Sequence, residues 1–262
     1  MNIAVCVKQV PQSANNSFVS ATNTLERNDE NQMNPSDVYA LETALHIKDR
    51  QGGEVAVLTM GRKSATSLLV QAAALGADGL YLLSDEMFAG SDTYATAKIL
   101  CAAISQLQNI DLVICGRRAV DGETGQVGPE IAAVLNLPCI TNVSGLLSID
   151  ENLIVCKRLT ETGYDILELT LPALITVCEG VEGVEHPRLS SIFGMRRAKN
   201  APITLLTNEQ LALNPASVGL SGSPTKVERV TQMARSTRHC ILEDDIKEAV
   251  RMAAKKIAGV AT

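Results

Sequence analysis

Four continuous apolar runs in the first half of the chain are typical of β-strands. They are Ile3–Val7, Val55–Met60, Leu80–Leu83 and Leu112–Cys115, and β-branched residues are frequent in them. A strand that is apolar at successive positions is buried on both faces, as the strands of a parallel sheet are. The pattern therefore predicts a sheet that is covered by helices on both sides.

Helical patterns separate these runs. The first begins at Asn34, has Pro35 in its first turn and is followed by Gly52-Gly53, which are common signals for a helix start and a helix end. Three more are expected over 64–75, from 91 or 92 onward, and from about 125–129. Alternating strands and helices predict right-handed βαβ units, and therefore an α/β fold with a doubly wound, mostly parallel, Rossmann-like sheet.

Residues 11–33 do not fit this alternation. They are rich in Asn, Ser and Thr and lack helical periodicity, so we interpret them as an excursion, such as a hairpin, between the first strand and the first helix. After Pro138 the pattern changes again. Stretches 139–149, 153–159 and 166–171 are separated by turn signals, which predicts an antiparallel meander. Another strand is expected at 173–178, then a mixed loop over 179–200 and a last strand at 203–206.

The C-terminal part has a different character. Residues 214–224 contain Pro, Gly and Ser with few apolar residues and predict an extended arm, whereas 243–257 form an amphipathic helical pattern. A lone helix cannot bury its own apolar face, so it must dock on the first domain or on a partner chain. We expect a nucleotide-binding α/β domain at 1–206, followed at 207–262 by the arm and the helix.

Composition and charge exclude several classes of function. The net charge is −6 and aromatic residues make up 3% of the chain, so nucleic-acid binding is disfavoured. No signal peptide and no apolar run of about 20 residues is found, and we expect a cytoplasmic protein without a membrane span. The 7 cysteines lack C-x-x-C spacing and lie mostly in apolar runs, as buried free thiols do in a reducing compartment. The histidines have no metal-ligand spacing.

The segment that carries candidate chemistry runs from Gly116 to Glu130, between a buried strand and a helix. Its glycines 122, 125 and 128 let a ligand approach the backbone. The helix N-terminus offers free N–H groups to a phosphate, and Thr124 and Gln126 can add side-chain donors. A glycine-rich turn with a capped helix and no ligand is the alternative. Asp121 and Glu123 are poor neighbours for a phosphate, so at least one of them is expected to point away from it.

Together, four segments resemble a known family. They are Val5–Pro11, Asn34-Pro35, Ala74–Asp78 and the loop Gly116–Pro129. In this combination and order the sequence is similar to the beta subunit of electron-transfer flavoproteins from residue 1 to about 206, and we expect the similarity to continue into the arm. The resemblance implies a nucleotide cavity formed by residues from four parts of the chain. They are Cys6, Asn34, Asp37, Met60, Gly116, Arg117, Arg118, Ala119, Val120, Asp121, Gly122, Thr124, Gly125, Gln126 and Val127.

This chain departs from ordinary members of the family inside the loop. Those members hold AMP and carry Asn and Thr at the positions of Gly125 and Val127, where they bind the AMP phosphate. The loss of both polar groups opens space. In this respect the loop resembles that of the electron-bifurcating branch of the family, in which FAD occupies the site. The resemblance therefore implies FAD here, with AMP as the alternative, and places Arg117 or Arg118 near the flavin.

The resemblance also implies a docking segment for a partner dehydrogenase at Pro187–Lys199. Its apolar anchor would be Ile192, Phe193 and Met195, flanked by Arg196 and Arg197. The family's usual Leu-Pro is Ile192-Phe193 here. A short amphipathic helix with a solvated basic face is the alternative interpretation.

The function implied by the resemblance is electron transfer in a heterodimer with an alpha subunit. FAD in this subunit would take a hydride from NADH. One electron would pass to ferredoxin, and the other would pass through the alpha-subunit FAD to a flavin-dependent dehydrogenase, for example one that acts on an acyl-CoA. An AMP-holding subunit without bifurcation, and a nucleotide-binding module without a redox role, are the alternatives.

Overall fold

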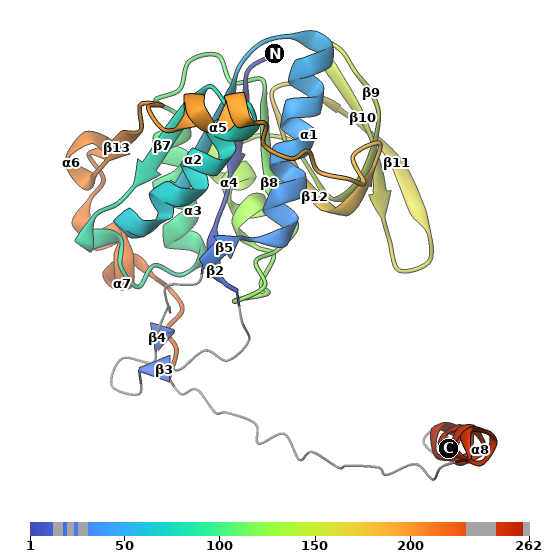
Figure 1. Cartoon of the computed structure of the whole chain (residues 1–262). Coiled ribbons are helices and arrows are strands. Elements are labelled where there is room, and N and C mark those ends of the chain that lie inside the picture. Colours follow the sequence, from blue (N-terminus) through green and yellow to red (C-terminus); the bar gives the residue numbers. More distant parts are fainter. Residues whose placement is uncertain (13–17, 20–23, 26–30, 229–244, 259–262) are drawn as a thin grey trace. The chain divides into compact units, whose positions relative to one another are not determined.

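The core of the protein is a nine-stranded sheet with strand order β11-β10-β9-β12-β8-β1-β6-β7-β13 (Figure 1). The computed structural model describes residues 1–12, 18–19, 24–25, 31–228 and 245–258. The strands from β9 to β13 in this order run parallel, and β10 and β11 extend the sheet antiparallel from β9. The bounds are β1 Ile3–Cys6, β6 Val55–Met60, β7 Gly79–Leu83, β8 Leu112–Gly116, β9 Cys139–Ile149, β10 Leu153–Leu159, β11 Tyr164–Thr170, β12 Ala173–Glu182 and β13 Thr204–Leu206.

Helices cover both faces of this sheet, and alternate residues of each strand point to opposite faces. Ile3 and Val5 pack with α1 (Pro35–Gln51) and α2 (Thr66–Leu75). Ala4 and Cys6 pack with α3 (Thr93–Ile104) and α4 (Val127–Leu135) on the other face. The apolar runs are therefore strands buried on both sides, and the predicted doubly wound α/β fold is confirmed.

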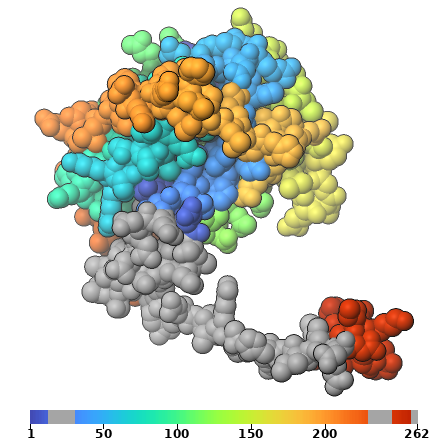
Figure 2. Space-filling model, viewed as in Figure 1, coloured from blue at the N-terminus to red at the C-terminus, as the bar shows by residue number. Residues whose placement is uncertain are grey.

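The meander predicted after residue 138 is confirmed as β9, β10 and β11. The mixed loop expected over 179–200 is wrong in part, because β12 continues to Glu182 and α5 forms at Ile192–Ala198. The segment that contains α5 crosses the molecular surface over α1 and α2, in gold and orange in Figure 2. The side chain of Ser191 accepts a hydrogen bond from the Gly194 N–H at 2.9 Å and caps this short helix. The helix is too short to show a helical periodicity in the sequence, so it was not predicted.

The excursion near the N-terminus begins and ends as a hairpin. Strand β2 (Gln9–Pro11) pairs antiparallel with β5 (Asn31–Met33), and β3 (Phe18–Val19) pairs with β4 (Thr24–Leu25). The rest of this stretch lies outside the described residues.

The extended arm expected at 214–224 is not found. A 3-10 turn at Pro215–Ser217 and the short helix α7 (Gly219–Gly222) follow α6 (Asn208–Leu211). The Leu220 N–H donates to Ala89 O at 3.1 Å, and Val218 is buried. Because this Pro- and Gly-rich segment finds its hydrogen-bond partners in the loop before α3, it packs without helical periodicity. The first compact unit consequently runs from Met1 to Glu228 instead of ending at 206.

The second unit, Arg229–Thr262, contains α8 (Ile246–Ala258), so the predicted terminal helix is confirmed. Its expected start at 243 lies outside the described residues. Ile246, Val250 and Ile257 are exposed on it. None of the helices in the described parts of the chain is long and apolar enough to cross a bilayer.

Candidate functional site

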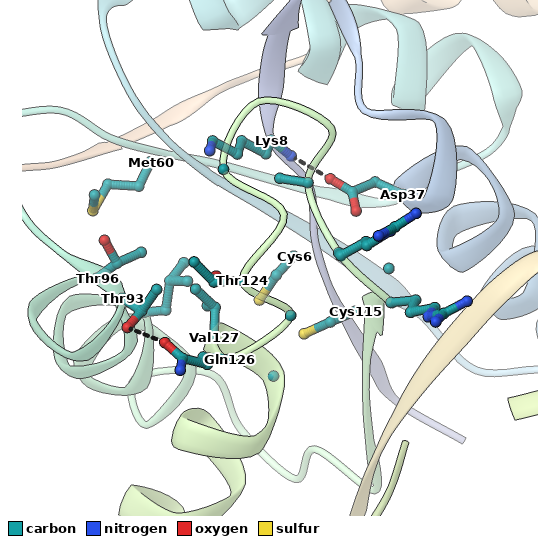
Figure 3. Close-up of a pocket in the computed structure, with 18 of the residues that line it drawn as sticks. Cys6, Lys8, Asp37, Met60, Thr93, Thr96, Cys115, Thr124, Gln126 and Val127 are labelled. Atoms are coloured by element: carbon teal, nitrogen blue, oxygen red, sulfur yellow. Dashed lines mark hydrogen bonds between the residues drawn. The ribbon is translucent and has the colours of Figure 1, made fainter. Parts of the chain in front are cut away.

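A cavity of about 350 Å³ opens at the carboxyl ends of β1 and β8 (Figure 3). The chain leaves β1 toward β6 on one side and later returns to form β8 on the other, so the strand order reverses between β1 and β8. In doubly wound sheets this reversal is where nucleotides bind. The beginnings of α3 and α4 supply the rest of the wall.

Most of the residues predicted for the site line this cavity. Cys6, Asp37, Met60, Gly116, Arg117, Arg118, Ala119, Gly122, Thr124, Gly125, Gln126 and Val127 belong to its wall. Three predicted residues, Asn34, Val120 and Asp121, do not line it. Gly128, which the sequence analysis also named, belongs to the wall as well. The structure adds residues that were not predicted for the site: Val7, Lys8, Ser91, Asp92, Thr93, Thr96, Leu100 and Cys115. The segment Val5–Pro11 and the expected helix start at 91 or 92 pointed toward part of this set.

Asn34 acts behind the wall. Its side chain is buried, and its Oδ1 accepts a hydrogen bond from Val120 N–H at 3.0 Å. Its Nδ2 donates to Arg118 O and to Asp37 Oδ1, each at 2.9 Å. One amide thus satisfies two backbone groups of the β8–α4 loop, which otherwise would be left without regular secondary-structure partners. Asn34 holds the loop in place.

Asp37 is the buried carboxyl of the site. Its Oδ2 accepts the Lys8 N–H at 2.7 Å. Burial raises the pKa of Asp37 to about 7, although hydrogen bonds from Asn34, Lys8 and Gly116 act to lower it. Gly116 allows this approach, because a Cβ on it would lie 2.2 Å from Asp37 Oδ1. The strand β8 therefore has to end in a glycine for the carboxyl to fit.

Ion pairs restrain the loop residues that were expected to disfavour a phosphate. The Asp121 carboxylate lies 2.6 Å from Lys8 Nζ. The Glu123 carboxylate lies 3.7 Å from the Arg118 guanidinium and is exposed. The negative charge of Asp121 is compensated at the cavity rim, and the Arg117 side chain adds positive charge to the wall.

The first turn of α4 is packed tightly against the sheet. A Cβ on Gly128 would lie 2.6 Å from Thr176 Cγ2, so only glycine lets the helix start this close to β12. Gly125 adopts φ +63°, where a Cβ would have its nearest contact at 3.3 Å, with Arg117 O. Nothing lies within 4 Å of a Cβ built on Gly122. The space beside Gly122 is therefore open, whereas a side chain at Gly125 would press against the backbone of Arg117.

The end of the first unit is tied to the rim of the cavity. Asp92 caps α3 by accepting from Ala95 N–H at 3.0 Å, and it also accepts from the N–H and hydroxyl of Thr225 at 2.9 and 2.7 Å. Burial acts to raise the pKa of Asp92, but these hydrogen bonds outweigh it and leave that pKa below its usual value. Asp92 thus holds both the first turn of α3 and the segment around Thr225, near the end of the first unit.

The predicted docking segment presents an apolar surface. Ile192, Phe193 and Met195 are exposed by 66%, 81% and 48%. Arg188 is fixed to Glu42 and Asp49 of α1, and Arg197 donates to Ala73 O of α2 at 3.4 Å. Gly194 and Ala198 form the buried side of α5. The segment is a short helix, as in the alternative interpretation, yet its exposed face carries the apolar residues.

Comparisons with known proteins give a consistent result. The sequence matches the family described as Electron transfer flavoprotein domain over residues 22–211. It is 40% identical over 252 residues to the electron transfer flavoprotein subunit beta of Thermoanaerobacterium thermosaccharolyticum, covering 96% of this chain and 95% of that one. It is 42% identical over 231 residues to the caffeyl-CoA reductase-Etf complex subunit CarD of Acetobacterium woodii, with 87% of each chain covered. It is 38% identical over 264 residues to protein FixA of Sinorhizobium fredii, covering 98% and 92%.

Proposed function

Because this chain belongs to the electron transfer flavoprotein family as a beta-type subunit, we propose that its cavity binds FAD and that the subunit takes part in electron bifurcation. The observation that carries the proposal is that Gly125 and Val127 line the cavity without a polar side chain, at the two positions where ordinary family members bind the AMP phosphate. When bound, FAD would accept a hydride from NADH and release the two electrons singly.

The residues present fit such a group. The first turn of α4 offers N–H groups without helical partners to a phosphate. Thr124 and Gln126 add polar side chains, and Lys8, Arg117 and Arg118 add positive charge. Aliphatic and thioether side chains such as Val7, Met60 and Leu100 provide apolar walls. The donor set therefore suits a phosphate-bearing nucleotide with an apolar portion.

The protein's own contribution is binding, orientation and charge. Asn34 and Asp37 fix the loop that forms one wall, and the ion pair between Lys8 and Asp121 fixes its tip. The guanidinium groups of Arg117 and Arg118 favour negative charge in whatever the cavity holds. Among relatives, one is named as a subunit of a caffeyl-CoA reductase complex and another as an electron transfer subunit of acryloyl-CoA reductase. By analogy, we propose an acyl-CoA dehydrogenase and ferredoxin as the two electron acceptors.

AMP is a second candidate, and the size of the cavity favours it. At about 350 Å³ the cavity is near the lower end of ligand pockets, which run from roughly 300 to 1,000 Å³. A complete dinucleotide would extend out of it. A mononucleotide would remain inside.

The number and kind of bound cofactors distinguish FAD from AMP in this cavity. The complex with the alpha subunit is purified without added nucleotide, flavin is quantified from its visible absorbance, and released nucleotides are separated by chromatography. We expect two FAD per heterodimer. One FAD with one AMP would support the second candidate, and a complex without flavin would contradict both.

Beta subunits of this family pair with alpha subunits, and we propose that the unit Arg229–Thr262 contributes to that pairing. Its helix α8 exposes Ile246, Val250 and Ile257 along one stripe. A stripe of this kind is stable in water only when another surface covers it.

The exposed face of α5 is proposed to anchor the dehydrogenase. We expect Ile192→Ala to lower the second-order rate constant of electron transfer to the dehydrogenase by about 10-fold, because apolar anchors carry much of the binding energy of an interface. NADH oxidation with an artificial acceptor should be unchanged, since Ile192 is 66% exposed and lies outside the cavity wall. Val134→Ala, on the exposed side of α4, is the matched control. Equal loss of both activities would show a folding defect instead.

A further inference from the structure

Two thiols lie side by side at the floor of the cavity. Cys6 ends β1, Cys115 lies near the end of β8, and the two residues are directly opposite in the parallel register. Both line the cavity, and Figure 3 shows the two side chains next to each other with their sulfur atoms on the same side. Both are buried and neither forms a disulfide.

The backbone geometry permits a bond between them. Neighbouring strands of a sheet are about 4.8 Å apart, and disulfides join Cα atoms separated by about 4.4 to 6.8 Å. Paired residues of parallel strands point to the same face, and Cys6 and Cys115 indeed belong to the same packed layer against α3 and α4. The two thiols are close enough that Cys6 raises the pKa of Cys115. Side-chain rotation with small strand shifts is therefore enough to join them.

Other cysteines are less suited to this reaction. Cys101 on α3 donates its thiol hydrogen to Ile131 O at 3.6 Å, and Cys139 lies at the start of β9. Neither lines the cavity. Cys156 is buried in the layer on the opposite face of the sheet. Among the described cysteines, Cys6 and Cys115 alone combine a facing partner with access from the cavity.

We propose that Cys6 and Cys115 are a redox-active dithiol that small oxidants close to a disulfide when the cavity is empty and that a bound nucleotide shields. In the reaction each thiol loses a proton and the pair loses two electrons as the S–S bond forms. A low-molecular-weight disulfide takes up the two electrons and two protons and leaves as two thiols. With the probe diamide, the diazene N=N bond becomes a hydrazine N–N bond with two N–H groups.

The shielding part of this proposal rests on the proposed nucleotide function, whereas disulfide formation in the empty cavity does not. Nucleotide binding and disulfide formation should oppose each other. If a bound nucleotide disfavours the disulfide, then the disulfide must weaken nucleotide binding by the same factor. The neighbouring Cys6 thiol, burial and the charge of the nearby Asp37 carboxyl all raise the pKa of Cys115. Closure should therefore speed up at alkaline pH, because the attacking species is a thiolate.

The test uses the full chain in complex with its alpha subunit, once with its nucleotide and once after nucleotide removal. Each sample is treated with diamide, blocked with iodoacetamide and digested with trypsin. We expect a disulfide between the peptides Met1–Lys8 and Ile99–Arg117 in the empty complex, at least 10-fold less of it in the loaded complex, and recovery of free thiols with dithiothreitol. FAD or AMP rebinding to the oxidised complex should weaken at least 10-fold.

Assignment of the bond needs two variants, because Cys101 and Cys115 share one tryptic peptide. Cys115→Ser should abolish the linked product, and the matched change Cys101→Ser should leave it. Absence of the product in the empty complex, or its persistence in Cys115→Ser, would overturn the dithiol. Equal yields in loaded and empty complexes would overturn the shielding, while the cofactor count would still decide the proposed function separately.

Discussion

Replacing Gly125 with Asn and Val127 with Thr should exchange the ligand of this subunit from FAD to AMP. Both changes return polar groups to residues that line the cavity. Gly125 has φ +63°, a left-handed conformation that Asn tolerates better than most residues. Its Cβ would come 3.3 Å from Arg117 O, a contact that a small shift relieves. The amide then occupies the space that we propose the rest of FAD passes through.

The expected effect is large. A hydrogen bond to a charged group contributes about 1.5 to 3 kcal/mol, so two restored donors to a phosphate should strengthen AMP binding by roughly 100-fold or more. Flavin content should fall from the proposed two to one per heterodimer, because the change does not touch the FAD that we propose for the alpha subunit, and one AMP should appear. The measurement is flavin absorbance together with chromatography of the released nucleotides.

A control variant separates this effect from a general disturbance. Gly163 lies in the exposed β10–β11 turn, and a Cβ there meets nothing within 4 Å. Gly163→Asn should leave both flavins in place. Unchanged flavin content in the double variant would contradict our explanation of the cavity.

Asn34→Ala should release the β8–α4 loop and abolish nucleotide binding in this subunit. The change leaves Arg118 O and Val120 N–H, both bonded to the Asn34 amide at 2.9 and 3.0 Å, without their partner. It also removes a donor from Asp37. An unpaired polar group costs about 1 to 3 kcal/mol when fully buried, and these two bonds are partly buried, so we expect the free energy of unfolding to fall by about 2 kcal/mol and nucleotide affinity to fall at least 100-fold.

Urea unfolding and nucleotide titration measure the two effects. Asn152→Ala, at an exposed turn, is the matched control and should change the free energy of unfolding by less than about 0.5 kcal/mol. Asn34→Asp keeps one acceptor but loses both donations and places a second carboxylate beside Asp37. It should therefore be as damaging as Asn34→Ala. Wild-type affinity in either variant would show that the loop keeps its position without this residue.

The sequence alone was sufficient for the α/β architecture, because strands buried on both faces and capped helices leave strong periodic signals. The runs at Ile3–Val7 and Val55–Met60 became β1 and β6, and Asn34-Pro35 marked the start of α1. The prediction of an extended arm at 214–224 was wrong because the backbone of this segment forms a hydrogen bond with a distant loop at Ala89. A pattern of neighbouring residues carries no information about such a contact.

For the site, the sequence determined the glycine-rich loop and its departure at Gly125 and Val127, since both are properties of consecutive residues. Only the tertiary structure decided the roles of Lys8, Thr93 and Cys115 in the wall and the place of Asn34 behind it. These residues come from strand ends and helix starts far apart in the chain. They meet because parallel strands end at the same edge of the sheet, and that edge exists only after the strand order has formed.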